Sequence, residues 1–335
     1  MSHNILILKG DGIGPEVVDV AVDILKHMGL DLNFSEAKAG YACYQEVGDP
    51  IPQTTIAAAR AADATLFGAV TTPPDIPNYR SAVVTLRREL DLYANLRPVH
   101  SLGLTGGHYR EGLDFYVVRE NTEGLYIGQE EDFGDYAIAK RLVTKKGSER
   151  IVRYAYELAR RTGKRKVTVV HKANILRLTD GLFRRTALAV AKEYAEQYGI
   201  EVQELLVDTM AMRLIKDPQN FEVIVTTNLF GDILSDEAAE LVGGLGVAAS
   251  GNIGEHGAIF EPVHGSAPDI AGKGIANPFA TLLATVMMLQ HIGENAAAEH
   301  LQAAVAATIR QGTLTPDLGG TANTARVKEQ IISNL

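Results

Sequence analysis

The feature that most constrains the fold is a regular alternation of short apolar runs with longer amphipathic stretches. Ile5 to Leu8 form an apolar run of strand length, and between Pro15 and Met28 the apolar residues recur at helical spacing. Further strands are predicted at 64–67, 115–118, 166–170, 202–207 and 223–225, and further helices at 54–60, 148–161, 181–198 and 232–242. Because strands separated by helices form mainly parallel sheets, the sequence predicts an α/β fold with a largely parallel central sheet.

The 335 residues suffice for two lobes but not for a large assembly of domains. The chain has no low-complexity linker and no internal repeat, so a boundary has to be inferred from composition. Residues 98–112 are rich in Gly, Pro and His, residues 250–257 are rich in Gly, and both are predicted to be crossing loops. We therefore expect one lobe formed by 1–98 with 252–335 and another formed by 99–251.

Charge and apolar content exclude several classes of protein. The net charge of -9 argues against a nucleic-acid binder, which would normally present a basic face. No apolar stretch is long enough to span a bilayer, and the run from Ile5 to Leu8 is too short for the core of a signal peptide. The single cysteine, Cys43, is expected to be a buried small apolar side chain. We therefore expect a cytoplasmic protein that binds neither membranes nor nucleic acids.

A glycine-rich turn from Gly10 to Pro15 follows the first strand and resembles a dinucleotide-binding fingerprint. The third glycine of G-x-G-x-x-G would fall at position 15, which is Pro. The pattern therefore favours a tight strand-to-helix turn over a Rossmann phosphate loop.

Two aspartates provide the strongest local signal for chemistry. Asp232 and Asp236 are four residues apart, which predicts two carboxylates on one face of a helix, near its amino end. Asp208 ends another predicted strand and could add a third carboxylate. The ordinary alternative to a functional site is that these carboxylates only offset the dipole of the helix. Oxygen ligands of this kind suit Mg²⁺ or Mn²⁺, which retain water and bind one or two carboxylates together with the substrate.

Three arginines, Arg87, Arg97 and Arg119, lie near predicted strand and helix ends, whereas Arg88 is expected to be a solvated helix charge. Guanidinium groups grip carboxylates through paired hydrogen bonds. Together with a divalent ion, the arginines imply a substrate with more than one carboxylate.

Tyr126 follows Arg119, and Lys172 follows the strand at 166–170. A lysine near arginines and a metal ion would have its ammonium form disfavoured, which suits proton transfer near neutral pH. Either residue alone would more often be structural, and the neighbouring His171 is expected to pack and hydrogen-bond.

At these motifs the chain resembles the isocitrate, isopropylmalate and homoisocitrate dehydrogenase family of β-decarboxylating dehydrogenases. The likeness runs from Gly10–Glu16 to Thr315–Gly320, and its most specific segments are Asn228–Gly254 and His264–Asn277. It implies a two-lobed, non-Rossmann fold in which 1–98 and 252–335 form the large cofactor-binding domain. The small domain, 99–251, would carry the metal and dimer elements.

The resemblance also implies a role for individual residues of this chain. The proton-transfer pair would be Tyr126 and Lys172, and the metal ligands for Mg²⁺ or Mn²⁺ would be Asp208, Asp232 and Asp236. The substrate would meet Ser81, Val84, Arg87, Arg97, Arg119 and Asn174. NAD would meet Thr71, Asn174, His264, Gly265, Ser266, Ala267, Pro268, Asp269 and Asn277, with Asp269 accepting from the ribose hydroxyls. Relatives are dimers in which the counterparts of Lys172 and Asp208 reach into the partner's site, so a homodimer or higher homo-oligomer is expected.

The choice of substrate depends on the segment from Tyr79 to Arg87, which resembles the helix that meets the variable arm of the substrate. Arg80 argues against an isopropyl arm, and Ser81 beside the apolar Val83 and Val84 suits a longer arm that ends in a carboxylate. Homoisocitrate is therefore the first choice, which would place the enzyme in lysine biosynthesis, and isocitrate and then 3-isopropylmalate follow. More than one of these polycarboxylates could be used.

The sequence is less consistent with three other classes of protein. A binding module has no need for three carboxylates and a strand-end lysine, and a regulatory subunit would be expected to have lost ligand positions. A metal-dependent phosphoryl-transfer enzyme would be expected to carry a G-x-x-x-x-G-K-[ST] loop, which the sequence lacks.

Overall fold

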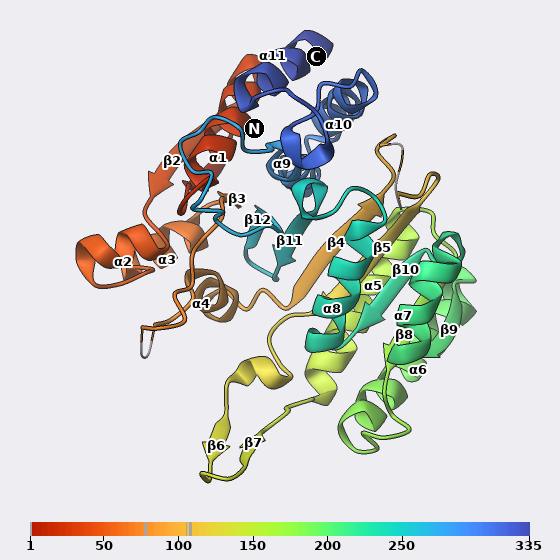
Figure 1. The fold of residues 1–335 in the computed structure, drawn as a ribbon. Coiled ribbons are helices and arrows are strands. Elements are labelled where there is room, and N and C mark those ends of the chain that lie inside the picture. The colour runs from red at the N-terminus through yellow and green to blue at the C-terminus, as the bar shows by residue number, and fades with distance from the viewer. Residues whose placement is uncertain (1, 77–78, 105, 107–108) are drawn as a thin grey trace. The chain divides into compact units, whose positions relative to one another are not determined.

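The computed structural model describes residues 2–76, 79–104, 106 and 109–335, and its contacts divide the chain into two compact units (Figure 1). Unit 1 consists of Met1–Asp91, Leu102–Glu111 and Val242–Leu335, and unit 2 consists of Leu92–Ser101 and Gly112–Leu241. Compared with the expected boundaries, residues 92–98, which include Arg97, fall in unit 2, whereas residues 102–111 and 242–251 fall in unit 1.

Unit 1 contains strands in the order β2-β1-β3-β12-β11. β1 is parallel to β2 and β3, β3 is parallel to β12, and β11 is antiparallel to β12. The strands are β1 His3–Leu8, β2 Leu32–Ala37, β3 Ala64–Phe67, β11 Ala249–Ile253 and β12 Ala258–Pro262. The helices are α1 Gly14–His27, α2 Tyr41–Val47, α3 Gln53–Ala61, α4 Ala82–Glu89, α9 Phe279–His291, α10 Asn295–Arg310 and α11 Thr324–Asn334, with short 3₁₀ turns at Leu245–Val247 and Pro316–Leu318.

The first strand and helix of unit 1 form where the sequence predicts them. The apolar run of β1 is buried, and α1 begins with Pro15 in its first turn, where a missing N–H costs nothing. Gly10 joins the two elements at a φ of 75°, and a Cβ added there would lie 2.1 Å from the carbonyl oxygen of Ala69. The turn therefore requires glycine for its own geometry, as expected, and the unit has no Rossmann strand order.

Unit 2 contains strands in the order β4-β5-β10-β8-β9. β4 is antiparallel to β5, and the pairs β5–β10, β10–β8 and β8–β9 are parallel. The strands are β4 Ala94–His100, β5 Asp114–Glu120, β6 Glu130–Asp132, β7 Ala137–Ala139, β8 Lys166–His171, β9 Glu201–Leu206 and β10 Val223–Thr226. The helices are α5 Lys145–Arg161, α6 Thr179–Tyr198, α7 Val207–Lys216 and α8 Asn228–Glu240, with 3₁₀ turns at Leu125–Ile127 and Pro218–Asn220.

The predicted α/β class and the mainly parallel pairing are confirmed, but both predicted crossing loops are partly wrong. Residues 98–100 belong to β4, residues 105, 107 and 108 lie outside the described part of the chain, and residues 250–253 belong to β11. The short strands β6 and β7 pair as a hairpin that projects from the rest of unit 2 (Figure 1). Among the described residues, no helix is both long enough and apolar enough to cross a membrane.

Candidate functional site

The largest cluster of predicted site residues lies in unit 2, where α8 packs on β4, β5 and β10. α8 begins at Asn228, four residues earlier than predicted, so Asp232 and Asp236 lie one and two turns inside the helix rather than at its amino end. The α8 backbone approaches β5 so closely that a Cβ on Gly231 would lie 2.6 Å from Cβ of Arg119. Glycine at this position lets the helix bring its carboxylates to the arginine.

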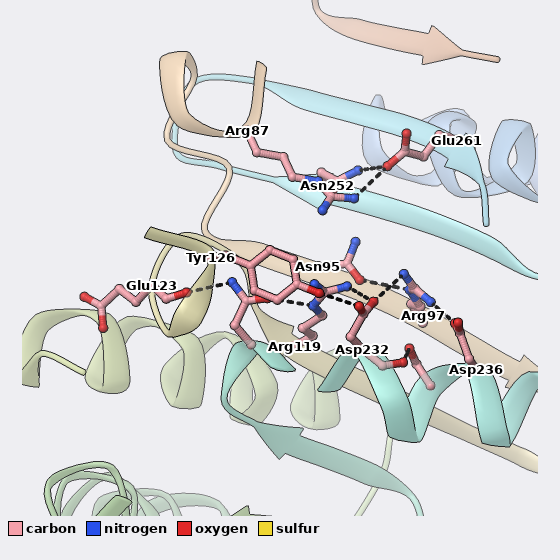
Figure 2. A network of polar contacts seen from close by, with 12 residues as sticks. Arg87, Asn95, Arg97, Arg119, Glu123, Tyr126, Asp232, Asp236, Asn252 and Glu261 are labelled. Atoms are coloured by element: carbon pink, nitrogen blue, oxygen red, sulfur yellow. Dashed lines mark hydrogen bonds and ion pairs between the residues drawn. The ribbon is translucent and has the colours of Figure 1, made fainter. Parts of the chain in front are cut away.

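Both aspartates are bound by arginines (Figure 2). Nη1 of Arg119, whose side chain is only 2% exposed, donates to Oδ1 of Asp232. Nη1 of Arg97 lies 2.6 Å from Oδ1 of Asp236, and its Nη2 lies 3.6 Å from Oδ1 of Asp232. The register of the antiparallel pair β4–β5 places Arg97 two residues along β4 from the partner of Arg119. The strands thus present two buried cations to one face of α8.

Tyr126 joins this cluster from the 3₁₀ turn after β5. Its hydroxyl donates to Oδ2 of Asp232 at 2.5 Å, and the guanidinium of Arg119 lies 5.0 Å from the centre of its ring. Burial is the main cause that raises the pKa of Tyr126 above its ordinary value, and the hydrogen bond to Asp232 raises it further. The phenol therefore keeps its proton over the neutral range and can act as a proton donor.

Two asparagines that were not predicted as site residues support the arginines. Oδ1 of the buried Asn228 accepts from Nε of Arg119 at 2.9 Å, while its Nδ2 donates to the carbonyl oxygen of Glu123 at 3.0 Å. Oδ1 of Asn95 accepts from Nε of Arg97 at 3.1 Å. Asn228 is the first residue of α8, and its bond to Glu123 links the helix to the turn that leads to Tyr126.

A second pair of predicted residues meets elsewhere in unit 2. Nζ of Lys172, which follows β8, lies 2.5 Å from Oδ1 of Asp208. The prediction that Asp208 ends a strand is wrong. Asp208 lies in the first turn of α7, which begins directly after β9. The hydrogen bond from Lys172 lowers the pKa of Asp208. Asn174 lies exposed two residues beyond Lys172.

The structure does not bring all three predicted metal ligands together within one chain. The described residues contain no group of three or more His, Cys, Asp or Glu side chains that could hold a metal ion. Asp232 and Asp236 share a helix face, whereas Asp208 is engaged with Lys172 on α7. In the described part of the chain, Asp208 therefore does not form a three-carboxylate group with Asp232 and Asp236.

In unit 1, Arg87 belongs to α4 and contacts a carboxylate rather than standing alone. Its Nη2 donates to Oε1 of Glu261 at 3.1 Å, and Nδ2 of Asn252 donates to the same oxygen at 2.8 Å (Figure 2). Ser81 is the residue before the first turn of α4, and Val84, three residues before Arg87, is half-buried. Glu261 and Asn252, from β12 and β11, were not predicted as site residues.

The segment 264–277 of unit 1, called loop 264–277 below, is held at both ends. Oγ of Ser266 lies 2.6 Å from Oγ1 of Thr71, and the carbonyl oxygen of Ser266 accepts a hydrogen bond from the backbone N–H of Ile13. At the far end, the carboxylate of Glu16 accepts from the backbone N–H of Ala276 at 3.1 Å. The N-terminal turn and α1 thereby clamp this loop.

The remaining predicted residues of loop 264–277 differ in exposure. Gly265, Pro268 and Asp269 are exposed, Ala267 is half-buried at a φ of 38°, and Asn277 is buried. Nδ2 of Asn277 donates to Asp317, from the Thr315–Gly320 motif, at 2.8 Å. Burial lowers the pKa of His264, so its imidazole is neutral at neutral pH. The exposed residues leave the middle of the loop accessible to a ligand.

Comparison with known proteins assigns this architecture to a family. Residues 4–331 match the model of the isocitrate/isopropylmalate dehydrogenase family. The chain is 47% identical to homoisocitrate dehydrogenase of Methanocaldococcus jannaschii, over 98% of this chain and 96% of the relative. It is 49% identical to 3-isopropylmalate dehydrogenase of Methanothermobacter thermautotrophicus, over 100% and 99%.

A solved structure agrees with these relatives. The crystal structure of isocitrate dehydrogenase from Methylococcus capsulatus superposes with a TM-score of 0.93 at 47% identity and covers 99% of both chains. The three relatives carry three different substrate names at nearly the same identity, so the similarity establishes the reaction class and not the substrate. The chain belongs to the isocitrate/isopropylmalate dehydrogenase family and is a β-decarboxylating dehydrogenase.

Proposed function

We propose that this enzyme catalyses the metal-dependent, NAD-linked oxidative decarboxylation of a 2-hydroxy tricarboxylate, with homoisocitrate, converted to 2-oxoadipate, as its first substrate. The observation that carries the proposal is the cluster of Arg97, Arg119, Tyr126, Asp232 and Asp236 on one face of α8. It places carboxylate-binding groups, a protonated phenol and hard oxygen ligands within contact of one another.

The arginines are suited to a substrate that carries several carboxylates. Arg97 and Arg119 are 8% and 2% exposed, and charges interact more strongly where water is excluded. Their guanidinium groups are fixed by Asn95 and Asn228, so a carboxylate meets donors that are already oriented. We assign Arg87 of α4 as the third carboxylate-binding arginine, with Glu261 holding its side chain in place.

The residues present fit a divalent cation. Asp232 and Asp236 offer hard carboxylate oxygens one helical turn apart, and their side chains are 33% and 53% exposed, so an ion can reach them. Mg²⁺ and Mn²⁺ bind one or two carboxylates and complete their coordination with water and substrate oxygens. We propose Asp208 of a second copy of the chain as the third ligand, in a homodimer or higher homo-oligomer.

The chain's own residues account for the proton transfers. When bound, NAD accepts the hydride and the divalent ion polarises the hydroxyl and keto oxygens of the substrate. Nζ of Lys172, which like Asp208 would come from the second copy of the chain, takes the hydroxyl proton of the substrate once it has parted from Asp208 and released its own proton to water. The 2-keto acid then loses the carboxylate β to its carbonyl as CO₂. The hydroxyl of Tyr126 protonates the carbon that is left with the electron pair.

Loop 264–277, together with Thr71 and Asn174, is proposed to bind NAD. Asp269 is exposed in the middle of this loop. A carboxylate there can accept hydrogen bonds from the ribose 2′- and 3′-hydroxyls, whereas it repels the 2′-phosphate of NADP. This charge argument favours NAD.

The preference for homoisocitrate rests on the first turn of α4. Arg80 is exposed before this turn, Ser81 precedes its first residue, and Val83 and Val84 are half-buried within it. Val83 and Val84 offer no side-chain hydrogen bond, so they suit the methylene groups of a longer arm. The terminal carboxylate of that arm would then lie near Ser81 or Arg80. Isocitrate is the second candidate substrate and 3-isopropylmalate the third.

The deciding experiment measures kcat/KM for homoisocitrate, isocitrate and 3-isopropylmalate with NAD and Mn²⁺, following NADH absorbance. We expect homoisocitrate to exceed isocitrate by roughly ten-fold, because each extra buried methylene contributes about 0.8 kcal/mol and a mispositioned carboxylate costs more. Removing the metal with a chelator should abolish the activity with every substrate. A preference for isocitrate or 3-isopropylmalate would reject the substrate assignment, and activity without metal would reject the mechanism.

A further inference from the structure

Asp11 lies in the glycine-rich turn that joins β1 to α1, and the proposed function assigns it no role. It is only 7% exposed. Its Oδ2 accepts from the backbone N–H groups of Tyr41 at 2.7 Å and Thr71 at 2.8 Å, and its Oδ1 accepts from the backbone N–H of Ala42 at 2.8 Å. A buried anion is thus stabilised by peptide N–H groups from two separate segments of unit 1.

Two of the three donors belong to the first turn of α2. The residue before this turn is Gly40, which has no side chain to cap the helix, and the turn itself contains no acidic residue. The free N–H groups of α2 therefore need an acceptor from elsewhere in the chain. A Cβ on Gly40 would lie 2.4 Å from Oδ2 of Asp11, so glycine allows the close approach. Asp11 thereby caps a helix that begins 30 residues later in the sequence.

The third donor is Thr71, one of the residues proposed to bind NAD. Its hydroxyl lies 2.6 Å from Oγ of Ser266, and its carbonyl oxygen accepts from the hydroxyl of Tyr79 at 3.3 Å. Burial and then the charge of Asp11 raise the pKa of Tyr79 to about 12, so this hydroxyl keeps its proton and can donate. All the polar groups of Thr71 therefore have partners within unit 1.

The turn that contains Asp11 also holds the start of loop 264–277. The backbone N–H of Asp11 donates to the carbonyl oxygen of Ala69 at 2.7 Å, and the backbone N–H of Ile13 donates to that of Ser266 at 2.9 Å. Ser266 is thus held by the turn through its backbone and by Thr71 through its hydroxyl. Without the carboxylate, Thr71 would lose the partner of its N–H, and the position of its hydroxyl would no longer be fixed.

We infer that Asp11 is a positioning residue of the proposed NAD site, where it fixes Thr71 and, through the contact of Thr71 with Ser266, the start of loop 264–277. The inference rests on the proposed function, because it presupposes that Thr71 and this loop bind NAD. Asp11 does not touch the cofactor in this account. Its loss therefore acts on cofactor affinity, since Thr71 and Ser266 would have to be ordered when the cofactor binds.

The test measures the Kd of NADH by fluorescence titration of the full chain without substrate. Asp11→Ala should weaken NADH binding by about 10-fold, because two side chains lose their preorganisation. The KM for NAD should rise in parallel, whereas the KM for the hydroxy acid should change by less than about three-fold. In a Thr71→Val background, Asp11→Ala should weaken binding by less than about two-fold further, because the hydroxyl through which Asp11 acts is already gone.

Asp11→Asn separates positioning from stability. An amide oxygen in the place of Oδ2 keeps the N–H groups of both Tyr41 and Thr71, whereas the opposite orientation keeps only that of Ala42. The first orientation should therefore prevail, with the NADH Kd within about two-fold of the parent value and a lower thermal midpoint, because Ala42 N–H is left unpaired. If Asp11→Ala does not fold, Asp11→Ser replaces it, because it keeps a polar atom and loses the carboxylate.

The matched control is Asp63→Ala, near the amino ends of the same two strands. Oδ2 of the exposed Asp63 accepts from the backbone N–H of Asn4, in β1, at 2.7 Å, and Asp63 directly precedes β3. The variant removes a bond between a carboxylate and a backbone N–H far along the strands from the turn that contains Asp11. It should leave the NADH Kd unchanged.

Three results would overturn the inference. The first is parental NADH affinity in Asp11→Ala when Thr71→Val or Ser266→Ala weakens binding. The second is an equal loss of affinity in Asp11→Asn and Asp11→Ala, which would show a residue that only stabilises the fold. The third is an additive loss in the Thr71→Val background, which would show that Asp11 acts through another group. Parental affinity in both Thr71→Val and Ser266→Ala would instead reject this cofactor site in the proposed function, and the positioning role with it.

Discussion

Tyr126 donates its phenolic hydrogen to Asp232, so a proposed proton donor and a proposed metal ligand share one hydrogen bond. The same carboxylate binds Arg119, whose guanidinium lies against the ring of Tyr126. A change at any of these three residues therefore alters the environment of the other two, and the first two predictions separate their contributions.

Tyr126→Phe should keep the ring that packs on Arg119 and lose only the hydroxyl. Because hydride transfer and loss of CO₂ precede this protonation, the first turnover should still form NADH, whereas overall turnover should fall by about 100-fold or more. The first-turnover burst of NADH absorbance is compared with the steady-state rate. Tyr136→Phe, on an exposed tyrosine, serves as the control. A parental steady-state rate would exclude Tyr126 as the donor.

Asp232→Asn and Asp236→Asn should both weaken Mn²⁺ binding but differ in stability without metal. Asp232 pairs with the nearly fully buried Arg119, so its loss should reduce the free energy of unfolding by about 1 to 2 kcal/mol, a value reduced for its partial exposure. Asp236 is half-exposed, and its loss should cost less than about 1 kcal/mol. Titration calorimetry and metal-free thermal unfolding test this contrast. Unchanged Mn²⁺ affinity in both variants would remove them from the metal site.

Asp269→Lys should weaken the use of NAD and improve the use of NADP. The substitution replaces an acceptor for the ribose hydroxyls with a cation that can pair with a 2′-phosphate. Because Asp269 is exposed, the change should leave the thermal midpoint nearly unaltered. The ratio of kcat/KM for the two cofactors is the measurement, and a ratio equal to that of the parent would exclude this position from cofactor selection.

Val83→Asn should narrow the preference for homoisocitrate over isocitrate. The amide gives the shorter arm a hydrogen-bonding partner, and a satisfied polar group is worth about 1 kcal/mol, or roughly five-fold in kcat/KM. Val47→Asn, on an exposed valine of α2, is the matched control. If both substrates respond equally to Val83→Asn, the arm does not lie at the first turn of α4.

Stability should fall as the pH drops below about 6.5, partly through His171. Burial lowers the pKa of His171, and its Nδ1 accepts from the backbone N–H of Ala173, which a protonated ring could not do. The unfolded chain therefore binds a proton that the folded chain resists, and folding is disfavoured once the pH passes below the unfolded pKa.

The pH prediction is checked by thermal midpoints from pH 8 to pH 5. His171→Asn should flatten the decline without abolishing it, because burial also lowers the pKa of His264. His300→Asn, on an exposed histidine, should leave the decline as it is. If the thermal midpoint of His171→Asn falls with pH as steeply as that of the parent, the imidazole of His171 does not contribute to the decline in stability.

The sequence predicted the elements whose apolar pattern is local, such as β1 and α1, and missed those defined by tertiary packing. β11 reads as a loop, since Ala249–Ile253 contains Gly251 and Asn252. It is a strand because β12 pairs with it. A Cβ at Gly251 would lie 3.1 Å from the side chains of Met287 and Phe260, so the strand packs closely there. α9 is buried on almost every side, so it has no amphipathic period to reveal it.

The candidate site shows the same division. The spacing of Asp232 and Asp236 predicted their shared helix face, but the start of α8 at Asn228 depends on its packing against Arg119. The ion pair of Lys172 with Asp208 could not be predicted, because it joins the end of β8 to the first turn of α7. Helix and strand periodicity describe one element at a time, and such contacts join two.

The clamp on loop 264–277 limits how cofactor specificity can be re-engineered. A graft that exchanged only these residues for those of another enzyme would have to reproduce the contacts of Ser266 and Ala276 with the first sixteen residues. Gly12 restricts the graft further, because a Cβ there would lie 2.0 Å from the carbonyl oxygen of Ser266. The transplantable module is therefore discontinuous, and a designer would have to move the N-terminal turn together with the loop.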